Sequence, residues 1–272
     1  MTRGALIALM ALLLSACVTP AKPLSKDLRT RLRQGSTAVL FYDDVGAVTY
    51  LEDTYRVLGV STSSAISVYK GTWDSNRELS ELHAAELASR GLKSQSAYQL
   101  LSASQIEELT AAERARYTFF PDKKSQAAKS AASGPALSPA LRDALSARGQ
   151  DWLVWGTWSG FTLHIRTLGM APAESMNLGL WVIDLKENRV VWQAGYWSYA
   201  EVELGERTGK EFLESDNLQG LKSEAGTRMR ACYIPDERKN SDDVGTLLGL
   251  ESVPAHQRRT FSRGCMTGVD LK

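Results

Sequence analysis

The order of apolar and polar residues predicts a chain in which short strands and helices are mixed. Residues 37–42, TAVLFY, are β-branched and aromatic and end at Asp43-Asp44, as expected of a buried strand followed by a turn. Residues 65–70, AISVYK, predict a second strand. The segment 43–64 shows neither a helical nor a strand period, so the pattern assigns it no element.

Three segments show the signals of helices. Residues 75–90 have Ser75 three residues before Glu78, which is the spacing of a capping box, and Gly91 follows as a stop. A short strand is expected after Gly91, and then a second helix over 102–117, capped by Ser102 or Ser104. Residues 206–231 also predict a helix, with an interruption near Gly220.

Residues 121–137 predict a flexible insertion. They consist largely of Ala, Ser, Lys and Pro without an apolar period, and so little apolar surface cannot offset the entropy cost of ordering the chain. A helix is expected directly after this insertion, with Ser138 at its cap and Pro139 at its first position.

Four β-rich runs follow and predict an antiparallel meander of consecutive hairpins. The third run is apolar on both faces, which places it at the centre of the sheet. Six of the seven tryptophans lie in these runs, and most of them are expected in the core. Tyr196 and Trp197, at a strand end, are instead candidates for a partner surface. The four runs are 152–158, 161–167, 178–185 and 189–197.

The N-terminus has the layout of a secretory signal. Arg3 precedes an apolar run of about ten residues, roughly half the length that a membrane-spanning helix needs. Leu14-Ser15-Ala16-Cys17 resembles the lipobox of bacterial lipoproteins at all four positions. The resemblance implies cleavage before Cys17, a diacylglycerol on its thiol and a fatty acyl group such as palmitate on its amine. A plain cleaved signal with an incidental cysteine is the alternative.

Residue 18 is Val and not the Asp of inner-membrane retention, so the resemblance favours the outer membrane, with the protein on the periplasmic face. Residues 17–35 then form a lipidated N-terminus and a basic tether, either a solvated spacer or a segment that contacts anionic head groups. Loss of Arg3 with residues 1–16 leaves 31 basic and 31 acidic residues, so the balance does not suggest nucleic acid as a partner.

The remaining cysteines, Cys232 and Cys265, are most simply one disulfide in an oxidising compartment. On the chain-entropy model this bond contributes about 3 to 4 kcal/mol. It would close a loop within an irregular C-terminal tail over 232–272. No CxxC pair supports a metal, and no cofactor is expected.

Candidate catalytic patterns are weak. GERTGK, residues 205–210, has one residue too few between its glycines for a phosphate loop and lacks the following Ser or Thr. No GxSxG exists for a serine hydrolase. His83, His164 and His256 are each read as surface residues, and the adjacent pairs Asp43-Asp44 and Asp242-Asp243 as turn caps.

Three passages resemble the sheet-and-helix domain shared by the TolB N-terminal region, the curli-secretion lipoprotein and the lipoprotein activators of penicillin-binding proteins. They are ELASRGLKSQSAYQLL, RGQDWLVWGTWSG and WVIDLKENRVVWQAG. The resemblance covers roughly residues 36–230 and implies a non-catalytic domain that binds partners.

The expected fold is therefore α+β: a mixed, largely antiparallel sheet with a late β-meander packed by helices, over residues 36–231, followed by a disulfide-closed C-terminal loop region. The function expected first is a lipoprotein that binds another envelope protein or peptidoglycan without catalysis. A homo-oligomeric subunit of an outer-membrane secretion channel is the alternative, and an envelope hydrolase using scattered residues is a third.

Overall fold

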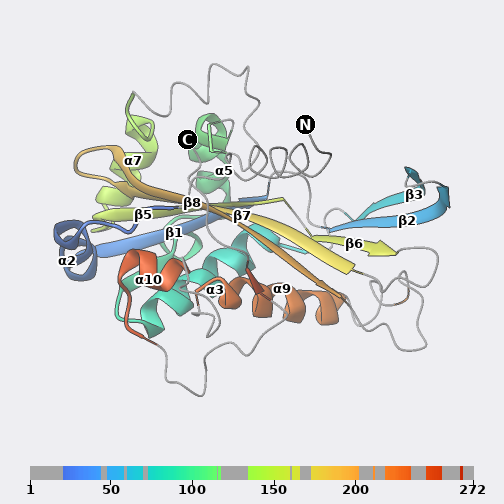
Figure 1. The fold of residues 1–272 in the computed structure, drawn as a ribbon. Helices are drawn as coiled ribbons and strands as arrows, with labels where there is room; N and C mark the ends of the chain where they lie inside the picture. Colours follow the sequence, from blue (N-terminus) through green and yellow to red (C-terminus); the bar gives the residue numbers. More distant parts are fainter. Residues whose placement is uncertain are drawn as a thin grey trace, which may run out of the picture.

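A computed structural model gives the fold of the chain (Figure 1). It describes residues 21–43, 48–57, 60–69, 73–114, 116–117, 134–159, 161–165, 173–201, 211, 218–233, 243–252 and 264–265. The signal and lipobox residues, and the GERTGK segment, lie outside these ranges.

The described strands form one mixed, mostly antiparallel open sheet, so the expected α+β class is confirmed. Its strands are β1 (Ser36–Asp43), β2 (Val48–Val57), β3 (Val60–Tyr69), β4 (Lys93–Ser96), β5 (Trp152–Trp158), β6 (Phe161–Ile165), β7 (Ala173–Asp184), β8 (Arg189–Glu201) and β9 (Gly264–Cys265).

β7 lies at the centre of the sheet, as predicted, and the expected antiparallel pairings of β6 with β7 and of β7 with β8 are confirmed, but the expected hairpin between β5 and β6 is wrong. β5 and β6 do not pair with each other; both pair antiparallel with the same side of β7, and β8 pairs with its other side. The register against β7 shifts by one residue between Trp158 and Thr162. β5 and β6 thus follow one another along the same side of β7 with a one-residue register shift between them, as on the two sides of a β-bulge.

β1 and β2 repeat this arrangement beside β5 and β6. β1 runs parallel to β5 and β2 runs parallel to β6. β3 then folds back on β2 as an antiparallel hairpin, and β4 pairs with β1. The segment 43–64, which had no predicted element, is therefore mostly this hairpin, and the strand expected over 65–70 is the second half of β3.

Helices cover both faces of the sheet (Figure 1). They are α2 (Lys26–Gln34), α3 (Ser75–Ser89), α4 (Ala97–Leu100), α5 (Ala103–Arg114), α7 (Pro139–Ser146), α9 (Gln219–Ala231) and α10 (Val244–Leu248). α3, α9 and α10 lie on one face, and α5 and α7 lie on the other. The helices predicted over 75–90, 102–117 and after Ser138 are confirmed.

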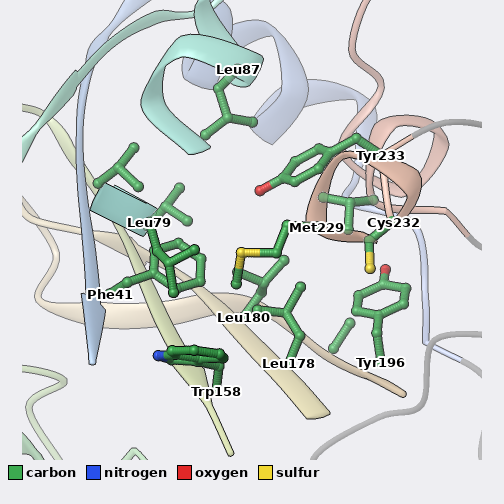
Figure 2. Close-up of a cluster of buried hydrophobic side chains, with 14 of the residues drawn as sticks. Phe41, Leu79, Leu87, Trp158, Leu178, Leu180, Tyr196, Met229, Cys232 and Tyr233 are labelled. Carbon is green, nitrogen blue, oxygen red and sulfur yellow. The ribbon is translucent and has the colours of Figure 1, made fainter. Parts of the chain in front are cut away.

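Two hydrophobic cores result, one on each face of the sheet. Alternate residues of β7 enter opposite cores: Leu178 and Leu180 pack beneath α3 and α9, while Trp181 and Ile183 pack beneath α5 and α7. Figure 2 shows the first core, in which Met229 of α9 reaches between Phe41 and Leu180. The five meander tryptophans whose side chains are described are buried, as predicted; they are Trp152, Trp155, Trp158, Trp181 and Trp192.

The predicted cap of α3 is wrong by one residue: Asp74, and not Ser75, caps the helix by accepting a hydrogen bond from the Arg77 N–H. α9 begins at Gln219, after Leu218 in a left-handed conformation, so a helix boundary lies near Gly220. Most of residues 206–217, the first half of the predicted helix, lies outside the described residues. A neighbouring residue can offer the same cap chemistry, so the pattern alone leaves the boundary open by a residue or more.

Both expected tails contain packed structure. α2 lies within the predicted tether, and its Leu32 is fully buried in the first core. In the predicted irregular tail, α10 buries Val244, Leu247 and Leu248. The Leu24 N–H donates to the Leu247 carbonyl at 2.8 Å, so these two parts of the chain pack on each other.

The end of the predicted insertion is also ordered. Ala136 and Leu137 are buried in the second core, and the Ser138 N–H donates to the buried carboxylate of Glu113 at 2.6 Å. The Tyr117 hydroxyl donates to the Ala136 carbonyl at 2.8 Å. These contacts join the end of α5 to the start of α7, and residues 118–133 between them lie outside the described residues.

Candidate functional site

His83 is the histidine that differs most from its predicted surface position. It is 1% exposed on α3, and its ring stacks on Phe41 with centroids 4.0 Å apart. Its Nδ1 lies 2.5 Å from the Tyr233 hydroxyl and its Nε2 lies 3.2 Å from the Met229 sulfur. Burial lowers the pKa of His83 to about 3, so the ring is neutral near pH 7. It has no access to solvent and acts as a core residue.

The other candidate catalytic groups that the structure describes are not assembled into a site. His164 is half-buried on β6, while His256 lies outside the described residues. Asp243 caps α10, as a turn-capping carboxylate should, by accepting from the Thr246 N–H at 2.8 Å and its hydroxyl at 2.7 Å. Among the described residues, no three His, Cys, Asp or Glu side chains lie close enough together to hold a metal ion.

Tyr196 does not lie on a partner surface. It is 2% exposed and packs in the first core beside Cys232 (Figure 2). The reason is the strand period: Trp192, Ala194 and Tyr196 are alternate residues of β8 and all face this core. The side chain of Trp197 lies outside the description.

The free edge of β3 is the candidate interaction site. Among the described residues, β3 pairs only with β2, so its outer edge has no partner strand. β2 pairs with β6 only as far as Glu52, and the rest of the hairpin extends beyond the sheet (Figure 1). An edge strand presents unpaired N–H and C=O groups that can bind an extended segment of another chain.

The sequence of β3 lacks the usual protection of such an edge. Residues 60–69, VSTSSAISVY, contain no Lys, Arg, Asp, Glu or Pro. Proteins commonly block edge strands with charges, prolines or bulges. β3 has only the last device: the β2–β3 register is irregular around Asp53. The sequence shows that this run is uncharged. Only the order of strands in the sheet shows that the run forms an edge strand.

A second feature lies at the opposite end of the sheet, where α2 is held by charged contacts (Figure 1). Arg31 pairs with Asp184 at 2.6 Å, and that carboxylate is 1% exposed. The same guanidinium lies over the Trp152 ring at 5.3 Å, and Arg33 donates to the Gly249 carbonyl. These arginines were expected to contact head groups or solvent, and they bind the protein instead.

No protein-family model matches the chain, and no curated protein matches it. The chain is similar to several solved structures, and three of them illustrate the likeness. They are hypothetical protein CT253 from Chlamydia trachomatis (16% identity, 70% of this chain and 84% of that chain, TM-score 0.37), the PelC dodecamer from Paraburkholderia phytofirmans (12%, 69% and 82%, 0.32) and lipoprotein GNA1162 from Neisseria meningitidis (12%, 71% and 93%, 0.31). TM-scores this low leave fold and function to be argued from the residues of this chain. No described helix is long and apolar enough to cross a membrane.

Proposed function

We propose that this chain is a lipid-anchored protein of the bacterial cell envelope that binds another protein through the free edge of β3 and catalyses no reaction. The unpaired, uncharged strand over Val60–Tyr69 carries the binding part of this proposal. The lipobox sequence carries the anchoring part. The burial of His83 and the capping role of Asp243 support a non-catalytic domain.

The anchor is placed at Cys17, acylated on its thiol and on its new amine, in the outer membrane with the domain in the periplasm. Cys17→Ser is expected to abolish lipid labelling and to move the protein from the membrane fraction to the soluble fraction, because several acyl chains supply the membrane affinity. Metabolic labelling with a fatty-acid analogue and fractionation measure both effects. Membrane retention equal to wild type would contradict the anchor.

A two-charge substitution tests the β3 edge. Ser61→Lys with Ser63→Lys adds the charges that protected edges carry, and is expected to remove most crosslinked adducts formed in intact cells. Ala111→Lys with Ala112→Lys adds the same charge to an exposed part of α5 and serves as the matched control. Adducts that persist equally in both variants would contradict binding at β3.

A second copy of this chain is the second candidate partner. An uncharged strand can pair with its own copy without placing like charges opposite each other. Mass spectrometry of the adducts and light scattering of the purified protein separate the two cases. Scattering at twice the chain mass or more, lost in the β3 variant, identifies self-pairing; a monomer with adducts to another protein identifies a different partner.

We also propose that Cys232 and Cys265 form a disulfide. Cys232 is buried directly after α9, and α9 contacts β9, which contains Cys265. Alkylation of the unfolded mature protein is expected to add two labels only after reduction, measured by intact mass. Two labels without reductant would contradict the bond.

A further inference from the structure

The described chain is already packed at its first residue. Ala21 is 4% exposed and Leu24 is 3% exposed, both in the first core. The Trp192 indole N–H donates to the Lys22 carbonyl at 2.8 Å. Together with the bond from Leu24 to Leu247, these contacts fix residues 21–24 against β8 and α10.

α2, which follows directly, is also packed on the domain. Ser25 caps the helix, Leu32 is fully buried, and Arg31 is bound to Asp184, the last residue of β7. Residues 21–34 are therefore an integral part of the domain. They do not extend the reach of any anchor that precedes them.

The distance from Cys17 to the domain is limited by covalent geometry. Four peptide units join Cys17 to Ala21, and each spans at most about 3.6 Å, so the two Cα atoms are at most about 14 Å apart. This inference rests on the proposed acylation of Cys17, which holds that residue at the membrane surface. The surface around Ala21 must then lie close to the lipid head groups.

We propose that the surface formed by residues 21–27 rests on the phospholipid bilayer. Its exposed residues are Lys22, Pro23, Ser25, Lys26 and Asp27. Neither lysine forms an ion pair with a described residue, so both ammonium groups are available to anionic head groups. The short connection between Cys17 and Ala21 holds this surface near the membrane. Its two lysines outnumber its one aspartate, so the surface is positively charged and is attracted to anionic head groups.

This attachment also orients the rest of the molecule. Figure 1 shows α2 at one end of the sheet and the β2–β3 hairpin at the other. A domain held at α2 directs the hairpin away from the membrane. The free edge of β3 is thereby presented to partners in the periplasm and kept from the lipid surface.

The test uses the full lipidated chain in vesicles of phosphatidylethanolamine and phosphatidylglycerol that carry a nitroxide on their head groups. A small fluorescent amino acid replaces Pro23, an exposed and uncharged residue of the proposed surface, in one sample and Gln219, the exposed first residue of α9, in another. α9 begins near the start of α3, where Lys222 pairs with Glu78, and ends near Arg90 at the other end of α3. Arg90 also donates to the Glu251 carbonyl, two residues from the Gly249 carbonyl that Arg33 of α2 binds. Gln219 is therefore at the end of α9 farther from α2.

Quenching is expected to be at least three times stronger at position 23 than at position 219. A 20-residue Gly/Ser insertion after Thr19 should remove most of this difference, because it releases the domain from the surface. Equal quenching at the two positions in the chain of native length would overturn the inference, as would a difference that the insertion leaves unchanged. A chain that does not stay with the vesicles would overturn the anchor itself, and flotation detects that failure separately.

Discussion

Lowering the pH from 7 to 5 is expected to reduce the free energy of unfolding by about 2 kcal/mol through His83 alone. Burial lowers the pKa of His83 to about 3 in the folded chain, whereas the unfolded chain has an ordinary value of 6.5. Between these values the unfolded state binds a proton that the folded state does not. Stability from this residue is thus complete above pH 6.5 and is lost progressively as the pH falls towards 3.

His83→Gln is expected to remove most of this loss, because glutamine can keep a hydrogen bond to Tyr233 but does not titrate. Urea unfolding at pH 7 and pH 5 measures the change. Phe41→Leu is the matched control: it removes the ring stacked on His83, and should lower stability by a similar amount at both pH values. A slope in His83→Gln as steep as in wild type would contradict the assignment.

The sequence predicted the elements whose signal is local. α3 follows from its start and stop signals, although its cap lies one residue earlier than predicted, α7 follows from Ser138 and Pro139, and β7 follows from its apolar residues on both faces. These features depend on residues within one or two turns or on one strand. Periodicity therefore reveals them without knowledge of the partners.

What the sequence did not predict depends on contacts between distant segments. β5 and β6 look like a hairpin locally, and only their pairing with the same side of β7 shows that they follow one another along it with a one-residue register shift. The sequence of β8 alone does not show which face of the sheet Tyr196 is on. Trp192 and Ala194, alternate residues of the same strand, pack in the first core, and Tyr196 therefore does too. α2 is too basic to suggest burial, and its arginines are accommodated by Asp184 and by backbone carbonyls of other segments.

The candidate sites also differ in whether a local sequence signal or a contact between distant segments defines them. The lipobox is a contiguous four-residue signal, so the sequence alone is enough to propose an anchor at Cys17. The free edge of β3 is defined by which strands do not pair with it, and strand order is not encoded in a local pattern. His83 lies beside Leu82 in an ordinary helix, and its burial depends on Tyr233, which is 150 positions away in the chain.

Arg90→Met is expected to destabilise the domain by about 3 to 5 kcal/mol, because each hydrogen bond from a charged group contributes about 1.5 to 3 kcal/mol. Arg90, at the end of α3, is 4% exposed. Its Nε donates to the Glu251 carbonyl at 3.0 Å and its Nη1 donates to the Tyr233 carbonyl. The side chain thus joins α3 to the segments on both sides of α10. Its loss leaves the buried Tyr233 carbonyl without this donor.

Arg77→Met on the same helix is the control, since Arg77 is exposed and pairs only with Glu81 one turn away among the described residues. Urea unfolding should give a lower midpoint for Arg90→Met and an unchanged midpoint for Arg77→Met. Limited proteolysis should also cut Arg90→Met first near its C-terminus, because residues 243–252 lose their attachment to α3. Equal midpoints in the two variants would show that this segment adds little to the stability of the domain, which the burial of Val244 and Leu247 argues against.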